Sequence, residues 1–538
     1  MKYLKDFSLL FLWMLIGGFY SVSLGQDASF DLQNYHLYTP FAFLENRWYA
    51  DIIPVGIHTF FNPLLDIPYY LLVKHFNHWP KLIAFYQGIF YGIFGFFIWK
   101  SSRLFFCGKT NRAFAIIATL IGCTGLATLV QIGLSSNEVH LAALMAASFY
   151  LFLLFFFSKR IFSPWIIFLS AFLAASAFGL KYTCAPFAVG LSAAFLFNFF
   201  RREQSAKIFL FFASGLLTGF LATNGIFMYR LWIQYGNPLF PFYNKLFLSP
   251  YFAAENFADR HFCPVGLWHY LSFPFTWVKP SITVGEYHLA DAHIAYAYVS
   301  FFILSLLLCF KKIKTPFSRK AMISVLLFTG VYYAAWLYAY CILRYAVILE
   351  AITGFLIVGA CAMIFRKKLA QFVAFSLALL LLMTMHLPDW GHVDFSDKAV
   401  AVDVPQIEEN SLVIFFGSPF GFMAPFFPLG TRFAGGIKYP KEKYPPHMQA
   451  EVQSRNPLLS SYYKYDFDEE LLKAIREHEG AIYLVSYPWA MIVHPITLEP
   501  FGLRGNVKDC LSFGSNLTMY QSNFSLCKLS KITEKNGE

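Results

Sequence analysis

The sequence is poor in charged residues. Asp, Glu, Lys and Arg make up 14% of the 538 residues, compared with roughly 25% in an average soluble domain. Hydrophobic residues make up 57% of the chain and aromatic residues 20%. So little charge cannot cover the surface of a soluble protein of this length, and the composition therefore excludes a large soluble enzyme with buried helices.

Several motifs are also missing, and each absence excludes a class of function. The sequence has no P-loop pattern, which argues against an ATP-driven pump. Its nine cysteines include no CxxC or CxxxC pair, so no zinc site is indicated by spacing. No basic stripe with interleaved aromatic residues occurs outside short loops, so the net charge of +11 does not indicate nucleic-acid binding.

What the chain does contain is a series of long apolar runs in its first 385 residues. Each run has about 17–22 residues and can cross a hydrocarbon core of roughly 30 Å as a helix. We therefore predict a polytopic α-helical membrane protein with about eleven transmembrane helices. The predicted spans are Phe7–Gly25, Leu82–Trp99, Ala113–Leu134, Val139–Phe157, Ile161–Leu180, Cys184–Phe200, Ile208–Tyr229, Ala292–Phe310, Ala321–Ile342, Tyr345–Phe365 and Leu369–Met385.

Basic residues are concentrated in alternate connections between these spans. The opposing short connections hold little positive charge beyond Lys181 and Arg344. The positive-inside rule therefore places the N-terminus in the cytoplasm. The basic connections contain Lys2 and Lys5; Lys100, Arg103, Lys109 and Arg112; Lys159 and Arg160; Arg201, Arg202 and Lys207; Lys311, Lys312, Lys314, Arg319 and Lys320; and Arg366, Lys367 and Lys368.

This orientation puts three long segments outside the cytoplasm: the loops 26–81 and 230–291, and the tail 386–538. The tail has predicted strands at Leu412–Phe416 and Ala481–Ser486 and a polar-faced helix at Glu469–His478. We therefore predict two domains, a transmembrane domain over residues 1–385 and an extracytoplasmic soluble α/β domain over residues 386–538. Cys510 and Cys527 are the only cysteines of the tail, and whether they form a disulfide stays open.

The first outer loop has the densest polar chemistry. Asp27 and Asp31 follow the first span four residues apart, so a helix starting here would carry both on one face. Either carboxylate could act as a general base or simply cap a helix. Together with His36 they could hold a divalent cation such as Mg or Mn, although no ligand spacing requires a metal.

Positive side chains that could bind phosphate occur at three places on the outer side. Lys181 and Tyr182 lie at one turn, Arg344 and Tyr345 lie at another, and Arg260 and His261 lie in the second outer loop. The alternative for these cations is an ordinary contact with lipid phosphates or with a neighbouring acid such as Asp259. Glu350, inside a predicted span, is a functional candidate or a buried partner of a basic residue.

These features resemble the GT-C glycosyltransferases, polytopic enzymes that use polyprenyl-phosphate-linked sugars. The resemblance covers the order of spans and loops, the interfacial segments expected in the first outer loop, and four short stretches: Asp31–His36, Asn62–Asp66, Gly236–Pro241 and Arg344–Tyr345. It implies inverting sugar transfer to a glycan, lipid or protein acceptor, with Asp31 or Asp27 as the general base. It also implies a bacterial inner-membrane location. No WWD-type signature is present, so protein N-glycosylation is not implied.

Two other functions fit the same layout. A glycan polymerase or ligase would also display its chemistry on the outer side. A transporter or flippase of lipid-linked sugars would be expected to have broken helices and inverted repeats, and the sequence shows neither pattern.

Overall fold

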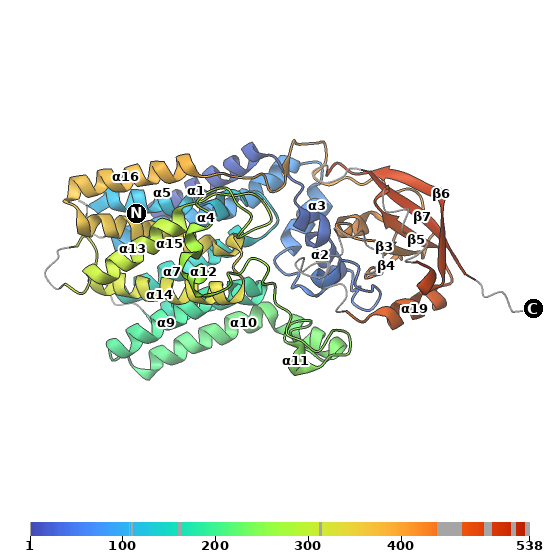
Figure 1. The fold of residues 1–538 in the computed structure, drawn as a ribbon, viewed down its shortest axis with the longest axis horizontal. Coiled ribbons are helices and arrows are strands. Elements are labelled where there is room, and N and C mark those ends of the chain that lie inside the picture. Colours follow the sequence, from blue (N-terminus) through green and yellow to red (C-terminus); the bar gives the residue numbers. More distant parts are fainter. Residues whose placement is uncertain are drawn as a thin grey trace, which may run out of the picture.

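The computed structural model describes residues 2–106, 108, 111–159, 163–310, 315–437, 465–488, 498–517 and 523–532. It shows a helical bundle joined end to end to a smaller domain that contains a sheet (Figure 1). Five of the basic residues used to predict the orientation lie outside the described residues: Lys109, Arg160, Lys311, Lys312 and Lys314.

The chain is a polytopic helical membrane protein. Among the described residues, eight helices are long and apolar enough to cross a membrane. Three shorter apolar helices occupy the remaining predicted spans, so the count of about eleven crossings stays a prediction. The eight are α1 (Lys2–Leu24), α4 (Pro80–Phe105), α7 (Glu138–Phe157), α9 (Ala185–Arg201), α10 (Ala206–Tyr235), α14 (Arg319–Ala339), α15 (Val347–Ile364) and α16 (Lys367–Thr384), and the shorter three are α5 (Arg112–Cys123), α8 (Trp165–Leu180) and α13 (His293–Leu307).

Small residues let neighbouring helices of the bundle pack closely. A Cβ atom at Gly92 of α4 would lie 2.2 Å from the carbonyl oxygen of Trp13 in α1. A Cβ atom at Gly219 of α10 would lie 2.3 Å from the carbonyl oxygen of Phe172 in α8. Backbones that approach this closely gain van der Waals contact, which is a main source of helix association in lipid.

One predicted span is broken. The stretch Ala113–Leu134 was expected to form a single helix, but α5 ends at Cys123 and a separate single turn, α6, covers Leu126–Leu129. The break occurs at Gly125, where a Cβ atom would lie 2.3 Å from Oε2 of Glu350. The Glu350 side chain of α15 therefore occupies the space that a side chain at position 125 would need.

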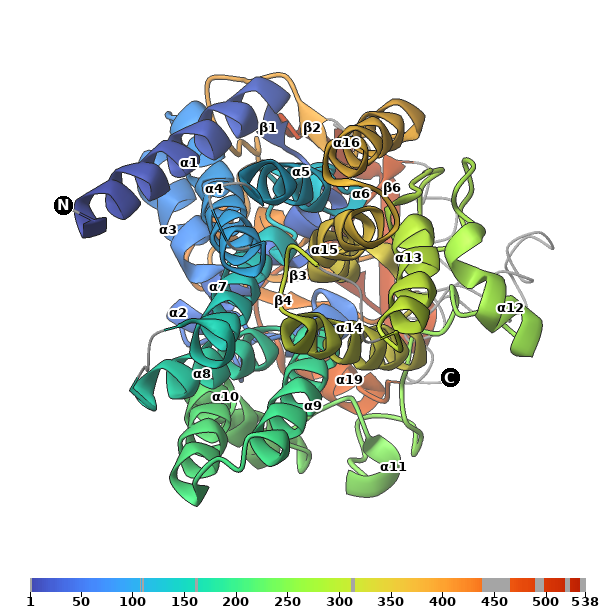
Figure 2. The ribbon, with the colours of Figure 1, turned by 90° about the vertical axis from the view of Figure 1, so that its left-hand side faces the viewer.

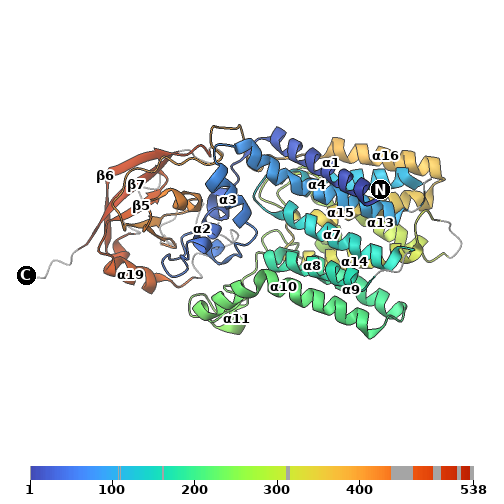
Figure 3. The same cartoon turned by 180° about the vertical axis from the view of Figure 1, so that it is seen from behind.

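The segment 26–81 lies between the bundle and the C-terminal domain (Figure 3). It contains β1 (Gln26–Asp27), the π-helix η1 (Leu32–His36), α2 (Tyr38–Leu44), the 3₁₀-helix η2 (Gly56–Phe60) and α3 (Ile67–Phe76). The segment 230–291 contributes α11 (Asn244–Phe247), α12 (Leu267–Ser272) and the 3₁₀-helix η5 (Phe273–Phe275). Tyr35, Tyr38 and Tyr69 of the first segment share a buried core with Phe422 and Met423 of the C-terminal domain. The helices of the segment 26–81 thus form the joint between the bundle and the C-terminal domain, and α2 and α3 each bury one face there.

The C-terminal domain is built on a five-stranded sheet with the order β4-β3-β5-β7-β6. Its strands are β3 (Leu412–Phe415), β4 (Arg432–Ala434), β5 (Ile482–Ser486), β6 (Leu503–Gly514) and β7 (Asn523–Lys531), and its helix is α19 (Asp468–Glu477). β3 is parallel to β4 and β5, whereas β7 is antiparallel to β5 and β6. The predicted strands and helix of the tail are confirmed, with ends that differ by one residue.

Both faces of this sheet are covered. Val413 and Phe415 of β3 pack toward the first segment, while Leu412 and Ile414 pack with Leu471 of α19. This alternation follows the two-residue period of a strand. It explains why the central strands β3 and β5 are buried throughout rather than amphipathic.

Two disulfides lie outside the helices of the bundle. Cys510 and Cys527 are paired directly across β6 and β7 and are bonded. Cys263 and Cys341 form a second disulfide, which their spacing in the sequence does not predict. It joins the segment 230–291 to the turn after α14, at the end of the bundle that faces the C-terminal domain. We call this the domain-facing end.

Candidate functional site

Polar side chains from six segments meet at the domain-facing end of the bundle. η1 and η2 approach from the first segment, and the starts of α3 and α7, the turn after α8 and the 3₁₀-helix η6 (Leu343–Ala346) complete the group. We refer to these residues as the polar cluster: Asp31, Tyr35, His36, His58, Asp66, Asn137, Glu138, Lys181, Arg344 and Tyr345.

Asp31 and Arg344 form the central ion pair of the polar cluster. Nη1 of Arg344 lies 3.3 Å from Oδ2 of Asp31, and Nη2 donates to the hydroxyl of Tyr345 at 3.1 Å. Nη2 also lies 3.8 Å from a carboxylate oxygen of Glu286. The side chains of Asp31 and Arg344 are 13% and 22% exposed, so both can be reached from outside.

The electrostatic surroundings keep Asp31 ionised. Burial raises its pKa, but nearby positive charge, that of Arg344 above all and also that of Lys181, brings the pKa below the usual value. His58 behaves differently, because burial lowers its pKa to about 4. At neutral pH the cluster thus combines an aspartate carboxylate with a neutral imidazole at His58.

Lys181 is held by structural partners. Its Nζ pairs with Oε1 of Glu138 and donates to the carbonyl oxygen of Ser136 at 2.8 Å. It also lies 5.8 Å from the centre of the Tyr345 ring. Much of its charge is therefore compensated before any ligand binds.

Tyr182 differs from the other predicted residues of this group. Its hydroxyl accepts a hydrogen bond of 2.9 Å from Asn224 of α10, and its ring packs at 6.0 Å against Phe242. The predicted role of Tyr182 in substrate binding therefore has no support in its contacts, which connect α10 with the segment 230–291.

His36 is oriented by a carboxylate. Its Nδ1 lies 2.7 Å from Oδ1 of Asp66, and the side chain of Asn137 donates to the same oxygen. Nε2 of His36 is buried without a hydrogen-bond partner among the described residues. An imidazole fixed through one nitrogen with the other nitrogen free is a common arrangement for proton transfer or ligand binding. Asp66 lies in the stretch Asn62–Asp66, which is part of the family resemblance. The sequence did not predict that Asp66 and Asn137 would bond to each other and orient His36.

Asp27 does not share the surroundings of Asp31. It lies in β1 rather than on a helix, so the expectation that both carboxylates share a helical face is wrong. Its Oδ1 accepts from the N–H of Ser29 at 2.8 Å and its Oδ2 from the N–H of Ser135 at 2.7 Å. Both oxygens are thus used to hold backbone, which is a structural role.

A metal site through Asp27, Asp31 and His36 is not formed. Among the described residues, no group of three His, Cys, Asp or Glu side chains is placed to hold a metal ion. Asp27 and His36 are instead engaged by backbone N–H groups and by Asp66. The residues present therefore do not fit the divalent cation that the sequence left open.

Arg260 and His261 lie outside the polar cluster. Arg260 donates to the carbonyl oxygen of Tyr338 at 2.9 Å and stacks on its ring, with 5.5 Å between the guanidinium carbon and the ring centre. His261 is exposed, and its backbone N–H donates to Asp259 at 3.1 Å. The predicted phosphate site at this pair is not supported, because Arg260 instead holds the loop to the end of α14.

Among the described residues, the partners of Glu350 are an acid and backbone N–H groups rather than a basic residue. It is fully buried, and its carboxylate accepts from the N–H groups of Ala127 at 2.9 Å and Thr128 at 3.2 Å. It also shares a hydrogen bond with the carboxyl group of Asp291. Asp291 accepts from the N–H of Leu126 at 3.0 Å, so the two acids bond three successive N–H groups of α6.

The turn that carries Arg344 is connected to this buried pair of acids. The side chain of Gln131 donates to the carbonyl oxygen of Ala127 at 2.6 Å and to that of Arg344 at 3.1 Å. Glu350 thus holds α6, and Gln131 fixes Arg344 relative to α6. Glu350 therefore helps to position Arg344 without being a member of the polar cluster.

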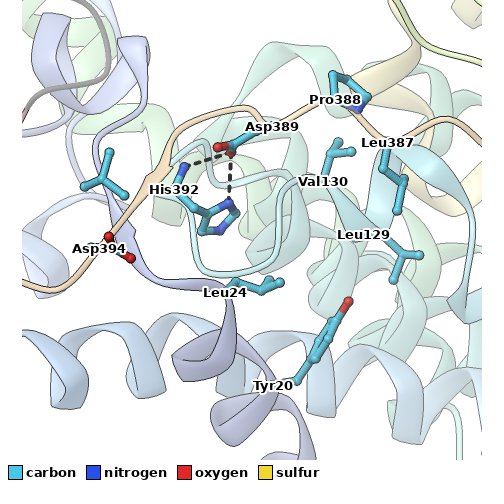
Figure 4. A pocket seen from close by; sticks show the side chains of 10 residues that line it. Tyr20, Leu24, Leu129, Val130, Leu387, Pro388, Asp389, His392 and Asp394 are labelled. Carbon is cyan, nitrogen blue, oxygen red and sulfur yellow. Dashed lines mark hydrogen bonds and ion pairs between the residues drawn. The ribbon is translucent and has the colours of Figure 1, made fainter.

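A cavity of about 660 Å³ lies elsewhere at the domain-facing end, where α1, α6 and the residues after α16 meet (Figure 4). Tyr20, Leu24 and Leu129 form an apolar wall, and His392 lies beside Asp389, with 3.5 Å between its Nδ1 and Oδ1 of Asp389. Oδ1 of Asp389 accepts from the N–H groups of Gly391 and His392, both at 3.0 Å. None of the predicted site residues lines this cavity.

Comparison with known proteins adds no further assignment. No protein family, no curated protein and no solved structure matches this chain.

Proposed function

We propose that the protein is a membrane glycosyltransferase. It transfers a sugar from a polyprenyl-phosphate-linked donor to an acceptor hydroxyl at the domain-facing end of the bundle. The observation that carries the proposal is the Asp31–Arg344 pair, in which a carboxylate and a guanidinium from distant parts of the chain meet and stay partly exposed. Sugar transfer from a lipid phosphate needs one group of each kind.

Each member of the pair has a role in the proposed reaction. The Asp31 carboxylate takes the proton of the acceptor hydroxyl while the hydroxyl oxygen attacks the anomeric carbon. The new glycosidic C–O bond forms on the face opposite the leaving polyprenyl phosphate, whose C–O bond breaks, so the configuration inverts. Arg344 binds the phosphate oxygens with its planar fork and stabilises the negative charge that develops there.

Donor binding also changes the basicity of Asp31. Among the charges that hold its pKa below the usual value, that of Arg344 is the largest. A phosphate bound to Arg344 neutralises that charge, so the pKa of Asp31 rises toward its ordinary value. The carboxylate thus becomes a better base once the donor is in place.

The proposed orientation places this chemistry outside the cytoplasm. Among the described residues, the basic connections between α9 and α10 and between α15 and α16 lie at the opposite end of the bundle from the C-terminal domain (Figure 1), as expected for a cytoplasmic N-terminus and an odd number of spans. The disulfides Cys263–Cys341 and Cys510–Cys527 support the assignment, because disulfides persist in oxidising compartments. For a bacterial inner membrane, the C-terminal domain is then periplasmic.

A transporter of lipid-linked sugars is the second candidate, since the break between α5 and α6 is a feature of many transporters. In such transporters the freed helix ends bind the substrate. Here the first N–H groups of α6 are bonded to Glu350 and Asp291. This favours a transferase, including a glycan polymerase or ligase, whose site would use the same pair.

The test is sugar transfer by the purified protein in vesicles, with a panel of polyprenyl-phosphate sugars and glycan, lipid and peptide acceptors. Asp31→Asn should fold and still bind donor but lose about 10²–10⁴ in rate, the usual loss for a general base. Arg344→Lys should retain more activity than Arg344→Ala, because lysine keeps the charge but not the fork. Asp389→Asn, an aspartate outside the polar cluster, is the matched control and should transfer normally. Near-normal transfer by Asp31→Asn would remove Asp31 as the base.

A further inference from the structure

A short apolar arm projects sideways from the bundle near its domain-facing end. Val265 is 86% exposed, Leu267 69% and Trp268 81%, and none of the residues of α12 is buried. Figure 2 looks along the bundle and shows α12 at its side, beyond α13. We refer to residues 265–272 as the lateral arm.

The lateral arm is fixed at both ends. Before it, Cys263 is bonded to Cys341 at the end of α14. After it, Phe273 and Trp277 are fully buried and their rings pack at 5.1 Å. The exposure of the arm is therefore part of the fold, because the flanking residues hold the arm away from the core of the bundle.

The apolar surface of the arm continues onto the side of the bundle. The ring of Phe275, just after the arm, contacts Tyr298 of α13 at 6.0 Å, and Tyr298 contacts Phe302 at 5.0 Å. Phe302 is 55% exposed on the side of a helix in the bundle, where lipid is its natural partner. The arm thus lies at the depth of the first turns of α13 and extends the lipid-facing surface sideways.

The C-terminal domain offers a contrast. Among its described residues after Trp390, the exposed large apolar side chains are the scattered Leu429, Leu511 and Ile532. Scattered exposed residues are normal for a surface in water, whereas a contiguous apolar patch marks a contact surface. The difference indicates that the arm and the domain face different solvents.

We propose that the lateral arm is seated in the membrane leaflet at the domain-facing end, in contact with phospholipid. Leu267 and Leu271 contact the acyl chains, and the Trp268 ring lies at the level of the headgroups, where tryptophan is enriched. The exposed Lys279 can pair with lipid phosphate. This inference uses the membrane architecture and does not depend on the proposed enzymatic function.

The seat of the arm also bears on the candidate site. The disulfide joins the arm to Cys341, which precedes Arg344 by three residues. A lipid-seated arm therefore keeps the turn with Arg344 close to the membrane surface, where the phosphate of a lipid-linked ligand lies.

The test measures the surroundings of the arm directly. A fluorescent amino acid is introduced by codon suppression at Leu271, and in separate proteins at Leu267, Phe302 and Leu429. Each protein is reconstituted into phosphatidylcholine–phosphatidylglycerol vesicles with ordinary or brominated acyl chains. Phe302 serves as the lipid-facing control and Leu429, 89% exposed in the C-terminal domain, as the water-facing control. Thermal unfolding of each protein confirms that it is folded.

Bromolipid should quench the probes at Leu267, Leu271 and Phe302, while iodide in the external buffer should quench the probe at Leu429 more strongly. Two results would overturn the proposal. Iodide quenching of both arm probes, as at Leu429, would place the arm in water. Protection of both arm probes from bromolipid and from iodide would show that protein covers the arm, from a second copy or another partner. Neither result depends on whether the protein transfers sugar.

Discussion

Replacing Glu350 with leucine should destabilise the protein strongly, although leucine suits a membrane helix better than glutamate does. Glu350 is the acceptor for the N–H groups of Ala127 and Thr128. A buried N–H group that loses its acceptor costs about 1–3 kcal/mol. Two such groups give about 2–6 kcal/mol for Glu350→Leu.

Glutamine at the same position separates loss of one hydrogen bond from loss of both. Its amide oxygen can still accept from one N–H group and its NH₂ group can donate to Asp291, so about 1–3 kcal/mol is expected to be lost. Replacing both members of a buried polar pair by apolar residues can be neutral. Such a compensating replacement is impossible for the N–H groups of Ala127 and Thr128, because no substitution removes a backbone N–H group.

Thermal unfolding in detergent can be followed by a thiol-reactive dye that reports exposure of the buried Cys123, Cys184 and Cys361. The midpoint should fall in the order wild type, Glu350→Gln, Glu350→Leu. Glu408→Gln is the control and should leave the midpoint unchanged, because Glu408 pairs with Lys528 at the surface and both side chains are more than half exposed. A Glu350→Leu protein as stable as the wild type would refute the assignment of Glu350 to the N–H groups of α6.

Three further predictions concern the polar cluster and the disulfides. Arg344→Met should move the acid limb of the pH profile of kcat/KM to higher pH, because it removes the largest charge that lowers the pKa of Asp31; an unmoved limb would mean that Asp31 does not set it. The unfolding midpoint should fall as the pH drops from about 6.5 to about 4, because His58 of the unfolded protein takes up a proton near pH 6.5 while His58 of the folded protein stays neutral until its pKa of about 4. His58→Asn should reduce this fall. An identical pH dependence in the variant and the wild type would contradict the role of His58. Cys263→Ser should lower the midpoint and the transfer rate more than Cys510→Ser does, because it opens a loop of 78 residues rather than 17 and frees the turn before Arg344; equal effects would show that the first disulfide is no more important than the second.

The sequence predicted the parts of the fold that depend on local composition. Runs of apolar residues located the helices, and the apolar strands of the tail were found because both faces of their sheet are buried. The break at Gly125 was missed for the opposite reason. The stretch around it is apolar, contains no proline, and reads as one helix. The break depends on Glu350 and Asp291, which are distant in sequence and bond the N–H groups of α6.

The candidate site likewise depends on contacts between residues that are distant in sequence, which local composition does not predict. Asp31 and Arg344 were both singled out, Asp31 by its place after the first span and Arg344 as a positive charge where few are expected. Their contact spans 313 residues and has no signature in the sequence. Asp66 and Asn137 were missed because their role exists only through His36, which the fold brings to them. Likewise, nothing in the spacing of Cys263 and Cys341 distinguishes them from the buried cysteines of the bundle.

Among the positive side chains of the polar cluster, Arg344 is the one whose partners are held loosely enough to be exchanged for a ligand. Lys181 is compensated by Glu138, and His36 is bonded to Asp66. Arg344 instead divides its contacts between Asp31 at 3.3 Å and Glu286 at 3.8 Å, longer than the usual 2.7–2.9 Å of a charge-assisted bond, and its Nε has no partner among the described residues. A guanidinium with loose partners can exchange them for a phosphate at little cost. In the proposed reaction this exchange frees the Asp31 carboxylate at the moment when the anomeric carbon arrives with the phosphate, so recognition of the donor and activation of the base follow from one movement of Arg344.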